Sequence, residues 1–122
     1  TMYRRCDSVL IGFMGTHQPA IWMGDYGFMT LMPQSGELKI KATDRQVRLD
    51  HGKEAATPYY YKVYLADHDV TTELVPTERA AKFRFTFPET KKAYIVIDAF
   101  DKGSYIKVLP AERKIIGYST KN

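Results

Sequence analysis

The segment Pro58-Tyr59-Tyr60-Tyr61-Lys62-Val63-Tyr64-Leu65-Ala66 decides the fold of this chain. Its odd positions carry only aromatic and aliphatic side chains, whereas its even positions include Lys62. Successive side chains of a strand point to opposite faces, so this alternation predicts a β-strand with one buried face. Asp67-His68-Asp69 then supplies turn chemistry, and residues 70–75 alternate again. The two runs together predict a β-hairpin.

Further β-rich runs lie on both sides of this hairpin. Between Lys82 and Phe87 the three phenylalanines fall on one side, which predicts a core face. The helical turn expected at Asp50 to Ala56 is too short to be more than a loop feature. The predicted strands number about nine: Val9 to Phe13, Phe28 to Met32, Leu38 to Lys41, Pro58 to Ala66, Val70 to Val75, Lys82 to Phe87, Ala93 to Ala99, Ser104 to Leu109 and Lys114 to Ser119.

Short strands joined by tight turns predict an all-β chain, an antiparallel β-sandwich with essentially no helix. The runs between strands lack the dozen or so residues that a helical crossover needs, which argues against a parallel α/β sheet. With 122 residues and 14.0 kDa, the chain is expected to form one domain over residues 1–122. Its apolar runs fall short of the ~20 residues of a membrane-spanning helix.

Charge and cysteine content exclude some function classes. The net charge is +4, and acids are interleaved with the basic residues, so a nucleic-acid partner is not expected. The tyrosines around Lys62 keep nucleic-acid binding open only as a third hypothesis. Cys6 is the only cysteine, which excludes an internal disulfide, and we interpret it as a small apolar residue near a strand start.

Polar residue types give no complete catalytic constellation. His17, His51 and His68 lack the close paired spacing of a local zinc motif, so we interpret them as solvated or loop-bracing residues. Glu73 and Glu78 resemble a glycosidase acid and base in type, but position parity places Glu73 on the solvent side of its strand. We therefore interpret both as surface charges. The sequence assigns no catalytic residue and no metal ligand to this chain.

Residues 16–27 read Thr-His-Gln-Pro-Ala-Ile-Trp-Met-Gly-Asp-Tyr-Gly and follow neither helical nor strand periodicity. Pro19 and the glycines of this stretch favour an ordered loop. The loop sets the only tryptophan, Trp22, beside the imidazole of His17, the amide of Gln18 and the carboxylate of Asp25. An aromatic face among hydrogen-bonding groups suits a sugar ring, so these four residues are the predicted substrate-binding residues. The three polar ones either bind sugar hydroxyls or hold the loop.

Ordered motifs along the chain resemble the amino-terminal domain of glycoside hydrolase family 92, a family of α-mannosidases. The similarity runs roughly from Val9 to Ile97 and is carried by Gly12-Phe13, Thr16-His17, Pro19-Ala20-Ile21-Trp22-Met23-Gly24-Asp25-Tyr26-Gly27, Leu31-Met32-Pro33, His51-Gly52-Lys53-Glu54-Ala55-Ala56, Pro58-Tyr59-Tyr60, Thr72-Glu73-Leu74, Glu78-Arg79 and Phe83-Arg84-Phe85-Thr86-Phe87-Pro88.

This resemblance implies a calcium-dependent, inverting exo-α-1,2-mannosidase that acts on mannose-containing glycans. The family's β-sandwich packs against a helical barrel, which supplies the catalytic acid and base, and the Ca²⁺ ligands are not expected in this chain. The chain is then a fragment of the amino-terminal sandwich domain, inactive alone, of a periplasmic or secreted enzyme. Self-association of the fragment through exposed sheet edges is a further expectation.

The resemblance also assigns a role to Trp22. It matches a tryptophan that projects toward the sugar on the leaving-group side in members that cleave α-1,2 linkages. Composition alone would place the only tryptophan of such a domain in the core. A second class of function also fits the sequence, a non-catalytic carbohydrate-binding β-sandwich module, because a sandwich with an exposed aromatic residue would look the same.

Overall fold

The computed structural model describes residues 6–15, 29–99 and 103–119. Within these ranges the regular structure is β-strand with two short 3₁₀ turns, and every described strand pair is antiparallel. The predicted all-β, antiparallel class is confirmed. Contacts divide the chain into two compact units, unit 1 (Thr1–Gly12 and Met32–Val96) and unit 2 (Phe13–Leu31 and Ile97–Asn122).

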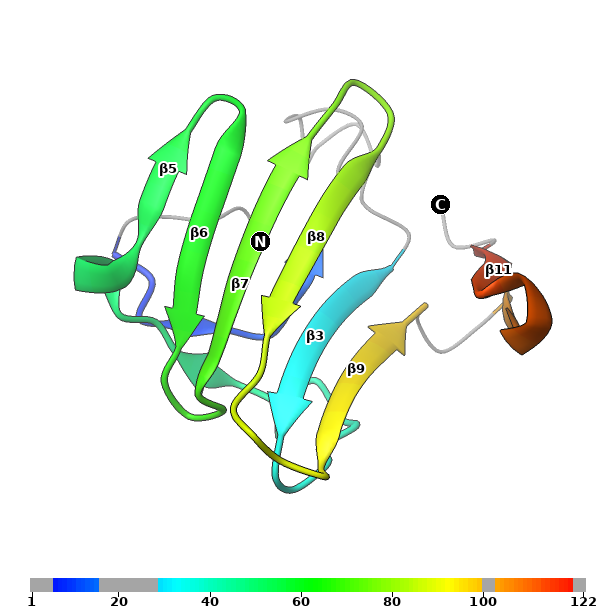
Figure 1. Cartoon of the computed structure of the whole chain (residues 1–122), viewed down its shortest axis with the longest axis horizontal. Helices are drawn as coiled ribbons and strands as arrows, with labels where there is room; N and C mark the ends of the chain where they lie inside the picture. The colour runs from blue at the N-terminus through cyan, green and yellow to red at the C-terminus, as the bar shows by residue number, and fades with distance from the viewer. Residues whose placement is uncertain (1–5, 16–28, 100–102, 120–122) are drawn as a thin grey trace. The chain divides into compact units, whose positions relative to one another are not determined.

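Unit 1 contains a four-stranded sheet in the order β5-β6-β7-β8, which Figure 1 shows side by side. The predicted central hairpin is present, because β6 pairs with β7 in a register that places Val63 opposite Thr72 and Leu65 opposite Val70. The strands are β5 (Ala55–Thr57), β6 (Tyr60–Leu65), β7 (Val70–Pro76) and β8 (Ala81–Thr86).

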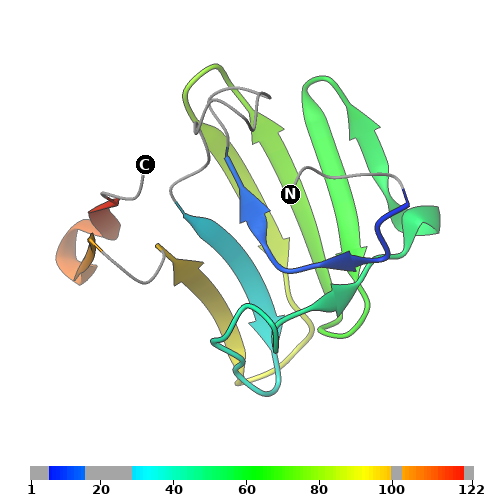
Figure 2. The ribbon, with the colours of Figure 1, turned by 180° about the vertical axis from the view of Figure 1, so that it is seen from behind.

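One face of this sheet forms the core of unit 1. Val63, Leu65, Val70 and Thr72 are fully buried on it. The short strands β1 (Val9–Leu10) and β4 (Val47–Arg48) pair with each other and cross this face, as Figure 2 shows. An isolated bridge from Leu49 to Leu65 joins the two layers.

The predicted phenylalanine core face is covered only in part. Phe83 and Phe85 lie on the inner face, opposite Leu74 and Thr72, and their rings stack with centroids 5.6 Å apart. Both side chains are nevertheless only half-buried. The reason is position, because β8 is the edge strand of the sheet and has a neighbour on one side only.

The prediction of a strand at Leu38 to Lys41 is wrong. Buried side chains form hydrogen bonds with backbone groups of this segment, and these groups are then not available for pairing with a neighbouring strand. The fully buried Gln34 amide donates to the Lys39 carbonyl oxygen and accepts from the Lys39 N–H, both at 2.8 Å. The buried Arg45 guanidinium donates to the carbonyl oxygens of Ile40 at 2.8 Å and Ile11 at 3.0 Å. Buried polar groups need such partners, and here they shape an irregular segment.

Other differences from the sequence prediction are small. The helical turn expected near residue 50 is the 3₁₀ turn η2 (His51–Lys53). Asp50 caps it, because its carboxylate accepts a hydrogen bond from the Gly52 N–H at 2.9 Å. The short strands β4 and β5 escaped prediction because two or three residues show no periodicity. Cys6 is exposed and precedes β1, which begins at Val9.

Unit 2 holds two described strand pairs. The first is β2 (Phe13–Met14) with Thr30 and Leu31, the first two residues of β3 (Thr30–Ser35). The rest of β3 belongs to unit 1, as does most of its sheet neighbour β9 (Ala93–Asp98). The second is the hairpin of β10 (Ser104–Leu109) and β11 (Lys114–Ser119), whose bounds match the prediction. A 3₁₀ turn, η3 (Pro110–Glu112), connects them and ends at Arg113 in a left-handed conformation. No helix long and apolar enough to span a membrane occurs in the described ranges.

Candidate functional site

All four predicted substrate-binding residues, Trp22, His17, Gln18 and Asp25, lie within residues 16–28, outside the described residues. The structure does describe the residues on either side of this segment. Phe13 pairs with Leu31 and Met14 pairs with Thr30, so the chain leaves and returns on neighbouring antiparallel strands. Phe13 and Thr30 are buried, which anchors both ends of the segment. A connection held in this way between packed strands is a usual place for binding residues.

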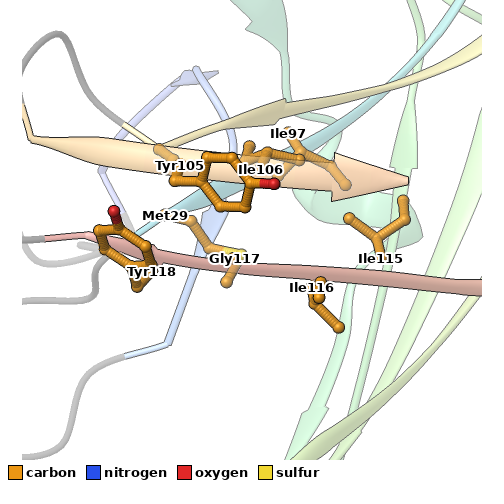
Figure 3. Close-up of a pocket in the computed structure, with 9 residues that line it drawn as sticks. Met29, Ile97, Tyr105, Ile106, Ile115, Ile116, Gly117 and Tyr118 are labelled. Carbon is orange, nitrogen blue, oxygen red and sulfur yellow. The ribbon is translucent and has the colours of Figure 1, made fainter. Parts of the chain in front are cut away.

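Unit 2 also contains an apolar groove, which begins at Met29 directly after this segment. It has a volume of about 430 Å³, and its walls come from Met29, Ile97 and the β10–β11 hairpin (Figure 3). The rings of Tyr105 and Tyr118 stack across the hairpin with centroids 5.7 Å apart. Sequence analysis predicted the two strands but not the groove, although the run of apolar residues on both faces of the hairpin was a signal for it.

In unit 1, the motif at residues 51–56 forms a hydrogen-bonded cluster. The imidazole of His51 contacts Glu54 Oε2 at 2.6 Å through Nδ1 and the Asp7 carbonyl oxygen at 2.8 Å through Nε2. The Tyr61 hydroxyl donates to Glu54 Oε1 at 2.7 Å. Because both nitrogens of His51 and both oxygens of Glu54 have partners, the cluster braces η2 against β6 and the amino-terminal segment. This agrees with the interpretation of His51 as a loop-bracing residue.

His68 has a similar bracing position. It is buried in the turn between β6 and β7, and its Nδ1 lies 3.1 Å from the carbonyl oxygen of Ser35. The Ser35 hydroxyl in turn donates to the carbonyl oxygen of His68. The turn is therefore tied to the end of β3 by reciprocal bonds. Nothing in this geometry leaves the imidazole open to a substrate.

Tyrosine and carboxylate pairs occupy the outer face of the four-stranded sheet. The Tyr60 hydroxyl donates to Glu73 Oε1 at 2.8 Å, and Arg84 Nη1 lies 3.6 Å from Glu73 Oε2. The Tyr64 hydroxyl donates to Asp69 Oδ1 at 2.7 Å. Hydrogen bonding to the carboxylates raises the pKa of both Tyr60 and Tyr64, so both remain protonated donors at neutral pH.

The two glutamates considered as a glycosidase pair have separate surroundings. Glu73 lies on β7 and is held by Tyr60 and Arg84, as described above. Glu78 follows β7 in the turn before β8, and its side chain is 88% exposed beside Arg79. These surroundings are those of a structural surface pair and a solvated charge, in line with the surface-charge interpretation.

A shallow hollow of about 360 Å³ lies beside these pairs, between η2 and the outer face of the sheet. Lys53, Lys62, Tyr64 and Thr71 contribute to it, and the Lys53 ammonium sits 4.4 Å from the centroid of the Tyr64 ring. Among the described residues, no group of three or more His, Cys, Asp or Glu side chains lies close enough to hold a metal ion.

Comparison with known proteins identifies the family. The model of the glycosyl hydrolase family 92 N-terminal domain matches residues 1–122. The chain belongs to glycoside hydrolase family 92. A solved family 92 structure, the inverting mannosidase BT2199 from Bacteroides thetaiotaomicron, is 42% identical with a TM-score of 0.85. That match covers 97% of this chain and 16% of BT2199, so this family 92 chain spans about a sixth of the relative's length.

A second family 92 relative supports the same assignment. The α-mannosidase BT3965 from Bacteroides thetaiotaomicron, solved in complex with mannoimidazole, is 36% identical with a TM-score of 0.69. The match covers 80% of this chain and 14% of BT3965. A comparison with curated proteins found no match. The family resemblance noted from the sequence motifs is confirmed.

Proposed function

We propose that this chain is part of an inverting exo-α-1,2-mannosidase that acts on mannose-containing glycans. The observation that carries the proposal is the family match over residues 1–122 together with 42% identity to an inverting mannosidase. Residues 1–122 then belong to the amino-terminal β-sandwich of a two-domain enzyme. In that enzyme they supply contacts to the leaving-group side of the substrate.

The loop at residues 16–28 provides those contacts in our proposal. Trp22 offers a flat aromatic surface to the C–H face of a mannose ring, and His17, Gln18 and Asp25 bind hydroxyl groups around it. The paired strands β2 and β3 support this role, because they fix both ends of the loop on a packed framework.

The chemistry belongs to the rest of the polypeptide in this proposal. Inversion requires two carboxyl groups about 6.5–9.5 Å apart, one as acid and one as base. Glu54 and Glu73 are poor candidates because internal partners hold them, and Glu78 is a poor candidate because it is a solvated charge. We therefore assign acid, base and Ca²⁺ ligands to a helical catalytic domain of the same polypeptide, and expect the chain alone to be inactive.

Calcium and location complete the proposal. Bound Ca²⁺ would contribute positive charge at the reaction site, and we expect chelation to abolish turnover of the complete enzyme and added Ca²⁺ to restore it. We propose a periplasmic or secreted enzyme, because polymeric glycan substrates are met outside the cytoplasm. Activity that survives full chelation would refute the calcium assignment.

The experiment that tests the function follows the product by NMR. The complete enzyme is given α-1,2-, α-1,3- and α-1,6-linked mannobiose, and the first anomer of mannose released is recorded before mutarotation. We expect fastest turnover of the α-1,2 linkage with initial release of β-mannose. Initial release of α-mannose would refute inversion, and glycan binding without hydrolysis would favour the carbohydrate-binding module instead.

A further inference from the structure

Two lysines of unit 1 line the same hollow on the outer face of the four-stranded sheet, the face turned toward the viewer in Figure 1. The hollow has a volume of about 360 Å³. The residues that line it come from η2, β5, β6, β7 and the cap of η2, and are Lys53, Glu54, Ala55, Lys62, Tyr64 and Thr71. None of them has a part in the proposed substrate contacts. The hollow is therefore a separate candidate site, built entirely from described residues.

Lys62 has no carboxylate partner, although the sheet register offers one. It lies directly opposite Glu73 on β7. The Glu73 carboxylate is instead engaged by the Tyr60 hydroxyl at 2.8 Å and lies 3.6 Å from Arg84 Nη1. Among the described residues, no carboxylate lies within ion-pair distance of Lys62. Its ammonium group can therefore meet an anion from outside the chain.

Lys53 is held at the hollow by an aromatic ring rather than by an acid. Its ammonium lies 4.4 Å from the centroid of the Tyr64 ring, within the range of a cation–π contact. The neighbouring Glu54 has both oxygens engaged, by His51 and by the Tyr61 hydroxyl, and its side chain is only 10% exposed. The cation–π contact orients the charge of Lys53 but does not neutralise it.

Thr71 adds a hydroxyl group to the two ammonium groups. It is half-buried and lies opposite Tyr64 in the register of β6 and β7. A phosphate group fits this set of donors, because it carries a charge of about −1.5 to −2 at neutral pH and three strong acceptor oxygens. A carboxylate has one charge and two oxygens, so it matches two ammonium groups and a hydroxyl less well.

We propose that this hollow binds a phosphate group, either inorganic phosphate or the phosphate monoester of a sugar. Lys53 and Lys62 form ion pairs with the phosphate oxygens, and the Thr71 hydroxyl donates a hydrogen bond to one of them. The volume of the hollow leaves room for a sugar ring beside the phosphate. Because both lysines are exposed, we expect a dissociation constant on the order of 1 mM.

A nucleic acid is a weaker occupant of this hollow. Proteins that bind nucleic acid through its backbone make about 6–10 phosphate contacts. The hollow offers two ammonium groups, and Arg84 on the same face already lies beside Glu73. A single phosphate group therefore fits the arrangement better than a phosphate backbone does.

Lysine acylation in the complete enzyme tests the inference. An N-hydroxysuccinimide ester modifies exposed ammonium groups, and peptide mass spectrometry reports the rate at each lysine, in inorganic phosphate and in sodium chloride of equal ionic strength. We expect phosphate at about twice its dissociation constant to slow acylation of Lys53 and Lys62 about threefold, because about two thirds of the sites are then occupied. Lys82 is the internal control, because it is exposed on β8 of the same sheet and lies outside the hollow.

Single variants test whether the two lysines share one phosphate group. Lys62→Met removes the charge and keeps most of the stem, so it should abolish the protection of Lys53 by phosphate. Lys82→Met is the matched control and should leave that protection intact. Mannose-6-phosphate distinguishes the two sources of the group. Protection at a lower concentration than inorganic phosphate would identify a sugar phosphate as the ligand, and equal protection would identify free phosphate.

Two results would show that phosphate acts only through ionic strength and would overturn the inference. They are equal acylation in phosphate and in chloride, and equal slowing at Lys82. Protection of Lys53 that survives Lys62→Met would also contradict it, because the two lysines would then not share a ligand. Protection by a single-stranded oligonucleotide but not by phosphate would assign the hollow to nucleic acid instead. These measurements do not depend on mannose release, so failure of the mannosidase proposal would leave the inference standing.

Discussion

Two hairpins of this chain, β6–β7 and β10–β11, differ in their exposure to water. In β6–β7, apolar and polar positions alternate, and the four inner side chains Val63, Leu65, Val70 and Thr72 are fully buried. In β10–β11, large apolar side chains occupy both faces and remain exposed. Strict alternation of apolar and polar residues is typical of a sheet with one covered face, whereas apolar residues on both faces are typical of a sheet covered on both sides. The first hairpin finds its cover within unit 1, whereas the apolar side chains of the second stay exposed among the described residues.

The largest effect should come from emptying the core of the first hairpin. Val63 is fully buried, so Val63→Ala should lower the free energy of unfolding of the chain by about 2 kcal/mol. The matched change Val108→Ala should cost less than about 0.5 kcal/mol in the same chain, because Val108 is exposed. Urea unfolding measures the free energy of unfolding of both variants.

The next effect on stability comes from the close approach of β10 and β11 at Gly117. Gly117→Ala places a Cβ 2.4 Å from the Tyr105 carbonyl oxygen, so the hairpin must open, at a cost of about 1–3 kcal/mol. Gly15→Ala is the matched control, because an added Cβ there meets nothing within 4 Å. Thermal melting compares the two variants, and equal melting temperatures would show that β10 and β11 do not approach as described.

The buried hydrogen-bond cluster predicts a smaller loss. Tyr61→Phe removes the hydroxyl that donates to Glu54 at 2.7 Å, and should cost about 1–2 kcal/mol. Tyr59→Phe deletes the same atom from a side chain that is 71% exposed, and should be nearly neutral. Chemical denaturation compares the stabilities of the two variants. Indistinguishable midpoints would mean that the His51, Glu54 and Tyr61 cluster does not brace unit 1.

The smallest effect concerns pH. Arg48 donates to Asp67 through its side chain at 2.8 Å and through its backbone N–H at 2.8 Å, and these bonds hold the pKa of Asp67 below its usual range. A depressed folded pKa stabilises the fold above the ordinary value of about 3.9 and loses that contribution as pH falls below it. Asp67→Asn should therefore destabilise slightly at pH 7, and the effect should shrink as the pH falls below about 3.9. A difference that is independent of pH would contradict this, and added salt should reduce it because Arg48 is exposed.

Much of this fold could be predicted from residue patterns because sheet faces repeat every two residues. The alternation at residues 59–65 and the turn at Asp67-His68-Asp69 determine the β6–β7 hairpin, and the bounds of β10 and β11 follow from similar runs. The false strand near Leu38 shows the limit of such patterns. This segment is irregular because the buried side chains of Gln34 and Arg45, each only five residues from its partner, form hydrogen bonds with backbone groups of the segment. A period-two pattern does not report such bonds between side chains and backbone.

The candidate site could likewise be predicted only in part from residue patterns. The composition of residues 16–27 pointed to a sugar-binding loop, and the described strands β2 and β3 hold its two ends. The groove beside Met29 was missed, since it is assembled from segments more than 60 residues apart in the sequence, as Met29 and Ile97 show. Periodicity reports which face a side chain takes, but not which distant segment lies opposite.

The most direct test of the account replaces Trp22 with Ala in the complete enzyme. Loss of ring stacking should lower kcat/KM for α-1,2-mannobiose by about tenfold, and Trp22→Phe should restore part of it. An aryl mannoside with a good leaving group should lose much less, because its departure depends little on leaving-group-side contacts. Equal losses on the two substrates, or no loss on either, would contradict the assignment of Trp22 to the leaving-group side.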